Sequence, residues 1–443
     1  MWGREILHLS LSTVVPGAPS WKPLPALATT PFGLAGGAAP WLWLVLARAG
    51  GLAALILGYR LAERLAGKVA GIAAVAALAT GPYWMHEMAH GFSEPLATGL
   101  LFGAVLCALS DRPQSALALG ALVGLARPEA WGLAVLYGLL LLHRRQVHPV
   151  ALAGVLLVVP ALWLVPDWLG SGDPFHASKV SRLVVPTGTA AALTALRDAA
   201  LLAPPPLTVM AVIGSVLATR RGDRRYAAIA LVVAIWASLL AVLMFSGYPA
   251  DGRFFIMPAA LVCVLGAAGA ELSIRSLRPS RRLAAAAVVA LAVAPIVGVR
   301  IGNSVNEASA AIKRARLEAD LRATLAGVAG PLRRCDRPML PTGMSWLKGQ
   351  VAWTADLPLR KVRTRNTTAG PFLKRLPNDA RLRLARSDTV TVYTHTVRFV
   401  LIAPFGPARI RIAHHPELRL RTVAAAGPWR ALVPANTPGC SVS

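Results

Sequence analysis

Long apolar stretches separated by short polar loops fill the first 300 residues of this 443-residue chain. A helix needs about 20 mostly apolar residues to cross a hydrocarbon core of roughly 30 Å. Apolar stretches near that length, or somewhat shorter, occur at residues 40–59, 69–85, 94–110, 149–165, 206–219, 226–246, 254–272 and 283–299. The pattern therefore predicts a polytopic, all-α membrane bundle of about eight full spans.

One further apolar segment, residues 114–143, does not fit a simple crossing because Ala126-Arg127-Pro128-Glu129 interrupts it. Proline breaks a helix and disfavours helical geometry at the residue before it. Both ends of the segment carry the Arg signals of a cytoplasmic side. We therefore expect a re-entrant helical hairpin with Arg127 and Glu129 near its tip. A single kinked helix is the alternative, but it would invert every later loop against its charge.

The basic loops predict the orientation of the spans, since Lys and Arg near span ends stay in the cytoplasm. The strongest inside signals are Arg220, Arg221, Arg224 and Arg225, followed by Arg275, Arg278, Arg281 and Arg282. This orientation places everything after Arg300 on the outer face. Counting backwards also places residues 1–39 outside, although no span precedes them. A truncated start that lacks an upstream helix is favoured over a tail that is translocated unaided.

The first 39 residues do not have the composition of a linker. Residues 4–9 fit a short amphipathic helix on the membrane surface. The sequence Trp21-Lys22-Pro23-Leu24-Pro25 predicts a rigid turn that favours the membrane interface. We expect residues 1–39 to form an outward-facing amphipathic loop segment before the bundle at 40–300.

Composition changes sharply after Arg300, and residues 301–443 predict an extracytoplasmic α/β domain. Residues 303–328 have helical spacing, and strands are expected at residues 382–384, 389–393, 399–402 and 419–423. Cys335 and Cys440 flank this region and are expected to form a disulfide on an oxidising outer face, with two free thiols as the alternative. Cys107 and Cys263 lie inside spans and fit small core residues.

The composition supports a membrane protein and indicates which kinds of binding partner its charge favours. Hydrophobic residues make up 55% of the chain, and the mean hydropathy is +0.56. A soluble chain of this length is less apolar. The net charge of +26 indicates attraction to anionic lipid headgroups or envelope polymers, because nucleic acid is a poor partner for an extracytoplasmic domain.

Ionisable residues in or beside spans are costly and are often functional. On the outward side the ionisable residues are Glu5, Glu87, Glu94, Asp167, Asp173, Lys179, Arg182, Asp251 and Arg253, with Arg127 and Glu129 deeper. A carboxylate can deprotonate an acceptor hydroxyl, and guanidinium groups hold phosphate in a bidentate manner. Glu5 and Glu94 are the candidate catalytic residues. The candidate substrate-binding residues are Arg127, Glu129, Asp173, Lys179, Arg182, Asp251 and Arg253, and Glu87 and Asp167 are given no role. Each also has a structural interpretation, such as a helix start at Glu94 or a turn at Asp251.

No soluble-enzyme motif is present: the sequence has no Gly-rich phosphate loop, no nucleophile elbow and no cluster of metal ligands. His86 and His90 have i, i+4 spacing around Glu87, but the order differs from that of a zinc-binding His-Glu-x-x-His helix. We therefore assign no metal site, and a divalent cation remains an open cofactor.

Several short sequences, in order and in topological placement, resemble the glycosyltransferase-C superfamily, membrane enzymes that use polyprenyl-phosphate sugars. They lie between residues 3 and 270, and none is specific alone. These sequences are Gly3-Arg4-Glu5, Trp21-Lys22-Pro23-Leu24-Pro25, Phe92-Ser93-Glu94-Pro95, Gly124-Leu125-Ala126-Arg127-Pro128-Glu129, Ser171-Gly172-Asp173-Pro174-Phe175, Gly247-Tyr248-Pro249 and Arg253-Phe254. The catalytic Asp of the family follows the first span, and this chain has no Asp before Glu5. The truncated start that the topology implies would explain that departure.

The resemblance implies inverting transfer of a sugar, mannose or a similar one, from a polyprenyl-phosphate donor to an envelope acceptor hydroxyl on the outer face. The sequence is similar to bacterial mannosyltransferases of that superfamily, and this similarity implies a multi-pass protein of the plasma (inner) membrane. Two alternatives stay open: a polytopic transporter or lipid flippase, and a non-catalytic envelope assembly protein. A transporter is less favoured because no repeat of the broken hairpin is visible in the second half.

Overall fold

The computed structural model describes residues 2–14, 21–184, 186–328, 338–341, 347–365, 390–392, 400–404, 407, 410–412 and 417–435. The chain forms two compact units. The bundle unit comprises Lys22–Trp168 and Asp173–Ala311, and the sheet unit comprises Met1–Trp21, Leu169–Gly172 and Ile312–Ser443. The N-terminal segment thus groups with the C-terminal part of the chain.

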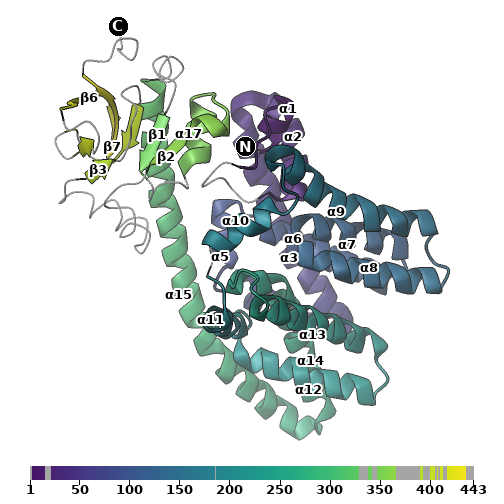
Figure 1. The fold of residues 1–443 in the computed structure, drawn as a ribbon. Helices are drawn as coiled ribbons and strands as arrows, with labels where there is room; N and C mark the ends of the chain where they lie inside the picture. Colours follow the sequence, from purple (N-terminus) through teal and green to yellow (C-terminus); the bar gives the residue numbers. More distant parts are fainter. Residues whose placement is uncertain are drawn as a thin grey trace. The chain divides into compact units, whose positions relative to one another are not determined.

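The bundle unit is helical throughout its described length, and Figure 1 labels most of its helices. Its first half contains α2 (Pro23–Phe32), η1 (Gly33–Ala38), α3 (Ala39–Ala66), α4 (Lys68–Ala79), α5 (Trp84–His90), α6 (Glu94–Leu109), α7 (Pro113–Ala126) and α8 (Pro128–His143). Its second half contains α9 (Pro149–Ser171), α10 (His176–Val184), α11 (Thr189–Ala200), α12 (Pro205–Arg220), α13 (Arg224–Phe245), η2 (Gly252–Phe255), α14 (Ile256–Ser276) and the first part of α15 (Pro279–Ala326).

These helices follow the predicted apolar stretches closely. Among the described residues, five helices are long and apolar enough to cross a membrane, or seven if each bent helix pair counts as one span. Three shorter apolar helices, α4, α7 and α8, accompany them. The helical, multi-span class is therefore supported, while the count of eight crossings and their direction stay predictions.

Two local predictions need correction. The rigid turn predicted at Trp21-Lys22-Pro23-Leu24-Pro25 is the start of helix α2, because a proline at the first helical position has no amide hydrogen to satisfy. The stretch predicted as one span over 69–85 ends as helix α4 at Ala79. A turn at Gly81 and Pro82 then leads into the separate helix α5.

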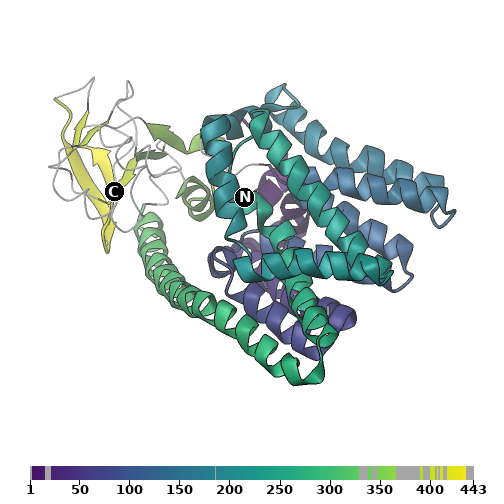
Figure 2. The same cartoon turned by 90° about the horizontal axis from the view of Figure 1, so that it is seen from below.

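The predicted break at Arg127 is confirmed as the tip of an antiparallel helix pair. Arg127 has extended backbone (φ −142°, ψ 113°) between α7 and α8. Gly124 packs against Trp131, and Gly120 packs against Ala134 further along the pair. With α9, the two helices share an apolar core and lie at one flank of this unit (Figures 1 and 2, blue). How deeply this hairpin enters a membrane is untested.

Small residues bring the other helices of the bundle into close contact. Gly266 and Gly269 of α14 lie against the backbone carbonyls of Leu207 and Met210 of α12, where a Cβ would collide. Tyr226 of α13 donates a 2.7 Å hydrogen bond to the carbonyl of Leu265. Packing through glycine and alanine is how apolar helices associate where lipid offers no hydrophobic driving force.

The sheet unit contains α1 (Trp2–Leu7), the end of α15, α17 (Lys348–Thr354), η4 (Leu359–Lys361) and seven described strands. The strands are β1 (Pro338–Pro341), β2 (Arg363–Arg365), β3 (Val390–Val392), β4 (Val400–Ala403), β5 (Ile410–Ile412), β6 (Leu420–Ala426) and β7 (Trp429–Pro434). Five form a mixed sheet in the order β2-β1-β4-β7-β6, and β3 pairs with β5. Strands β2, β1 and β4 are parallel, and β4, β7 and β6 are antiparallel.

The predicted helix at residues 4–9 and three of the predicted strands have counterparts in α1, β3, β4 and β6. The predicted strand at 382–384 and the predicted Cys335–Cys440 disulfide lie outside the described residues. Cys107 and Cys263 are free thiols, with Cys263 buried in α14. The helix and sheet together agree with the α/β class predicted for this part of the chain.

Candidate functional site

A buried ion cluster joins three separate helix starts of the bundle unit. The carboxylate of Glu94, at the start of α6, is 1% exposed. Its Oε1 accepts hydrogen bonds from Arg127 Nη2 at 2.7 Å and from Lys22 Nζ at 3.0 Å. Lys22 Nζ also donates to Ser93 Oγ at 3.1 Å. Its two cations share the Glu94 carboxylate, and two further buried carboxylates, Glu87 and Glu129, lie close to Arg127.

Each member of this cluster is positioned by a local feature of the sequence. Lys22 directly precedes Pro23, which begins α2. Glu94 occupies the first turn of α6, where the positive end of the helix dipole stabilises an anion. Arg127 is at the α7–α8 break, which turns its side chain out of the regular helical array. Separate helix ends therefore deliver three charges to one point.

Glu87 of α5 adds a second buried carboxylate beside this cluster. It is 2% exposed, and its Oε2 has no hydrogen-bond partner among the described residues. Neither Glu87 nor Lys22 was among the residues assigned to the site from sequence. Lys22 had a signal, a lone Lys directly before a Pro-initiated helix, but we interpreted that sequence as a turn.

An aromatic ring links the cluster to Arg253. The guanidinium carbon of Arg127 lies 4.9 Å from the centre of the Phe254 ring, and that of Arg253 lies 5.8 Å from it. Arg253 Nε is 2.9 Å from Asp251 Oδ2. This contact is an ion pair without hydrogen-bond geometry, since Nε has no hydrogen-bond partner in the described chain. The predicted residues Arg127 and Arg253, 126 positions apart, thus flank one ring.

Glu129, two residues beyond Arg127, has a different environment from Glu94. Its side chain is 6% exposed, and neither carboxylate oxygen finds a hydrogen-bond partner in another described residue. Tyr248 lies nearby, with its ring 5.7 Å from that of Phe254. Burial, and secondarily the negative charge of Glu129, raise the pKa of Tyr248 to about 12. The phenol is therefore a neutral O–H group at neutral pH.

The other four predicted site residues have environments of their own, although the charge of Arg182 acts on Tyr248. Asp173 and Lys179 form an exposed ion pair at 2.5 Å, and Asp173 Oδ1 accepts the Phe175 amide. Arg182 is exposed on α10. Glu5 belongs to the sheet unit, where its Oε1 accepts the Leu359 amide at 3.1 Å and its Oε2 accepts the Ser10 hydroxyl at 3.0 Å.

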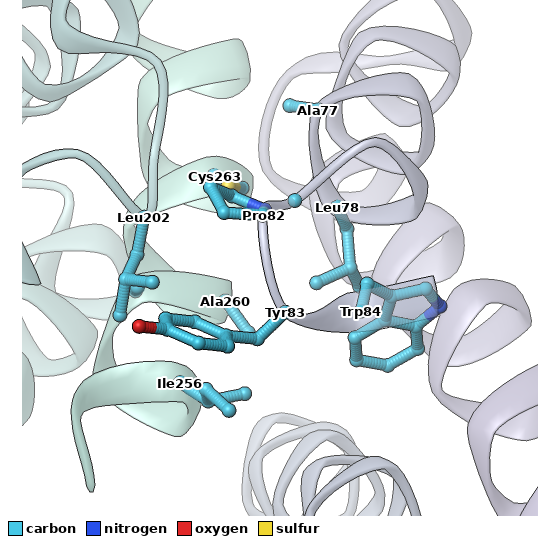
Figure 3. Close-up of a pocket in the computed structure, with 11 residues that line it drawn as sticks. Ala77, Leu78, Pro82, Tyr83, Trp84, Leu202, Ile256, Ala260 and Cys263 are labelled. Atoms are coloured by element: carbon cyan, nitrogen blue, oxygen red, sulfur yellow. The ribbon is translucent and has the colours of Figure 1, made fainter. Parts of the chain in front are cut away.

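An apolar hollow of about 290 Å³ also lies in the bundle unit. Figure 3 shows its lining from the segment around Tyr83 and Trp84 and from Leu202, Ile256 and Cys263. Burial, and secondarily Asp251, raise the pKa of Tyr83. The hollow is suited to an apolar group, and Tyr83 supplies a hydroxyl on its wall.

Within the described residues, no group of three or more His, Cys, Asp and Glu side chains is arranged to hold a metal ion. His86 instead pairs through Nδ1 with Glu307 Oε2 at 3.1 Å, and its ring lies 4.2 Å from that of His90.

No protein-family model matches the sequence, and no curated protein matches it. Solved structures do share its fold. Two are crystal structures of ArnT from Cupriavidus metallidurans, one in the apo state and one bound to undecaprenyl phosphate. Their TM-scores are 0.57 and 0.58, and each alignment has 15% identity and covers 100% of this chain and 93% of that chain. The likeness shows a shared fold of the ArnT type.

Proposed function

We propose that this chain is an integral membrane glycosyltransferase of the glycosyltransferase-C type, which transfers a sugar from a polyprenyl-phosphate donor to an acceptor hydroxyl. The carrying observation is the group of cations Lys22, Arg127 and neighbouring Arg253, which retain N–H donors, on a fold shared with a protein crystallised with undecaprenyl phosphate. Charged groups in apolar surroundings are costly, and they commonly mark a binding site.

The lipid phosphate would be held by donors that the protein leaves unused. Arg127 Nε has no partner among the described residues, and Lys22 Nζ can donate more hydrogen bonds than the two it makes to Ser93 and Glu94. The guanidinium carbon of Arg253 lies 5.8 Å from the centre of the Phe254 ring, and this side chain is more exposed than that of Arg127. Guanidinium and ammonium groups at these points would bind the phosphate and stabilise its charge as it leaves the sugar. The predicted contributions of Lys179 and Arg182 remain part of this proposal.

The reaction needs a proton acceptor for the attacking hydroxyl. The hydroxyl oxygen bonds to the anomeric carbon, the bond from that carbon to the phosphate oxygen breaks, and the proton passes to a carboxylate. Glu94 and Glu5 are the acceptors we predicted. In Glu94, Oε1 is occupied by two cations, and Oε2 accepts only a 3.3 Å bond from Ser93. Glu94 Oε2 is therefore the oxygen that would take the proton.

A radiolabelled hexose transfer assay tests this function. Purified protein in nanodiscs is given undecaprenyl-phosphate mannose with a bacterial envelope fraction as acceptor. We expect label to leave the lipid with release of undecaprenyl phosphate. The Arg253→Lys variant should lower transfer about 10-fold, which corresponds to about 1.4 kcal/mol of transition-state stabilisation. Transport of intact lipid without cleavage of the sugar–phosphate bond would instead favour a flippase.

The proposal also places the C-terminal α/β domain outside the plasma membrane. Ser246 and Ser276 are exposed at the ends of α13 and α14, which the charge pattern assigns to opposite sides. In a background with all four cysteines replaced, Ser246→Cys should react with an impermeant maleimide in intact cells. Ser276→Cys should react only after lysis, and the reverse pattern would overturn the topology.

A further inference from the structure

The described polar groups near Phe254 divide into hydrogen-bond donors and acceptors. The donors are Lys22, Arg127 and Arg253, which carry positive charge and have N–H groups left over. Among the described acceptors, Glu129 has two buried oxygens without a partner in another residue, and Glu87 has one. A buried carboxylate without hydrogen bonds costs several kcal/mol, so its retention calls for a ligand that supplies donors.

Burial opposes a charge on Glu129, while the helix dipole and nearby cations favour one, and neither satisfies its oxygens. It lies in the first turn of α8, where the helix dipole favours an anion, and the charges of Arg127 and Lys22 act on it from nearby. None of these cations comes within 4 Å of its oxygens to form an ion pair. A phosphate would be repelled at this point, whereas hydroxyl groups would donate to both oxygens.

From this division we propose that Glu129 and Tyr248 form the subsite that recognises the sugar hydroxyls of the donor, separate from the cations that take its phosphate. Tyr248 provides a hydroxyl and an aromatic face, and its ring lies against that of Phe254. The subsite rests on the proposed function, and it assigns the phosphate to the cations around Phe254 and the sugar hydroxyls to Glu129 and Tyr248. A carboxylate acceptor discriminates strongly against ligands that lack the matching hydroxyl.

The test compares four lipids that share the undecaprenyl phosphate and differ only in the sugar, one of them having none. Dissociation constants of undecaprenyl phosphate and of undecaprenyl-phosphate mannose, glucose and galactose are measured by native mass spectrometry on the full chain. In the wild type, at least one sugar lipid should bind about 10-fold more tightly than the bare lipid. Glu129→Gln should remove this gain and leave the affinity for undecaprenyl phosphate within about 2-fold. Tyr248→Phe should remove part of the gain.

The outcomes separate the subsite from the proposed function. Failure of the wild type to bind undecaprenyl phosphate would overturn the proposed function itself. Binding of undecaprenyl phosphate with no gain from any of the three sugars would overturn only the subsite. The subsite would also fall if Glu129→Gln and Tyr248→Phe, both folded by thermal melting, kept the full gain. Arg253→Lys is the matched control, since it should weaken all four lipids alike.

Discussion

Two buried carboxylates, Glu5 in the sheet unit and Glu129 in the bundle unit, meet opposite surroundings. Both are at least 94% buried and both lie on a helix. Glu5 accepts one hydrogen bond on each oxygen, from Leu359 and Ser10, and Arg4 lies 3.9 Å from it. Glu129 accepts none from another described residue. The first ties two segments of its unit together, while the second keeps both oxygens open to a ligand.

The contrast extends to the cations that accompany each carboxylate. Arg4 donates to the carbonyls of Leu357 (2.6 Å) and Ala352 (3.2 Å) at the end of α17, and stacks 4.9 Å from the Trp353 ring. Arg127, near Glu129, donates a hydrogen bond from Nη2 to Glu94, but its Nε has no partner within the described chain. Burial alone therefore does not identify a functional charge, and unused hydrogen-bonding capacity is the feature on which our proposal for Glu129 and Arg127 rests.

The largest effect is expected from Glu94→Gln, which leaves Lys22 and Arg127 buried without their carboxylate. Breaking a buried ion pair from one side costs about 3–5 kcal/mol. Denaturant unfolding in mixed micelles measures the loss of unfolding free energy. The matched control is Glu271→Gln, which removes a partly exposed i, i+4 pair with Arg275 and should cost about 0.5 kcal/mol or less. Equal losses in the two variants would contradict the account of the cluster.

Glu5→Gln should lower stability by a smaller amount, about 1–3 kcal/mol. The amide nitrogen of Gln cannot accept a hydrogen bond, so either the Leu359 amide or the Ser10 hydroxyl loses its partner. The same unfolding experiment measures it, and limited proteolysis should show earlier cleavage near α1. If Glu5→Gln were as stable as the wild type, the hydrogen bonds of Glu5 would not stabilise the sheet unit, and Glu5 would no longer contrast with Glu129.

Glu129→Gln should change stability with the opposite sign, by a gain of up to about 1 kcal/mol. Neutralising a buried carboxylate that has no hydrogen bonds removes a desolvation cost, and functional sites commonly carry such a cost. The unfolding free energies of Glu5→Gln and Glu129→Gln, measured side by side, sharpen the comparison. A loss above 2 kcal/mol in Glu129→Gln would show that its oxygens are satisfied within the protein.

The last effect depends on pH and concerns Lys348, a buried cation of the sheet unit. Burial, and secondarily Arg363, lower the pKa of Lys348 to about 8. The unfolded chain therefore binds more protons than the folded chain between pH 8 and the ordinary Lys value near 10.4, so stability should rise with pH across this window. Below pH 8 the full cost of the buried charge is present. Lys348→Met should flatten the rise of the unfolding free energy between pH 8 and about 10.4. An unchanged slope in this variant would show that Lys348 does not cause the rise.

Much of the bundle was predictable because apolar length and proline chemistry are local properties. Pro128 predicted the break at Arg127, and the apolar stretches predicted helices such as α9 and α13. The sheet was harder, since β1, β2 and β5 are three or four residues long and long stretches of chain separate them from their partners, whereas β6 and β7 form a local hairpin. Short strands carry little pattern of their own, and their pairing is set by tertiary contacts.

The site was predictable in its residue types but not in its contacts. Charges in apolar surroundings pointed to Glu94, Arg127, Glu129 and Arg253. The bond from Lys22 to Glu94 joins residues 72 positions apart, and no local spacing encodes it. Asp173 and Lys179 are also an acid and a base in the outward set, like the residues of the buried cluster. In the structure, however, they form an ion pair with each other at the surface.

The central claim, that the buried cations of the bundle receive a lipid phosphate, is tested most directly by the affinity for undecaprenyl phosphate. Native mass spectrometry would compare the wild type with Lys22→Met and with Lys68→Met, which removes an exposed Lys at the start of α4. The account predicts that Lys22→Met weakens binding about 10-fold or more while Lys68→Met binds as the wild type does. Equal affinities in all three proteins would contradict it.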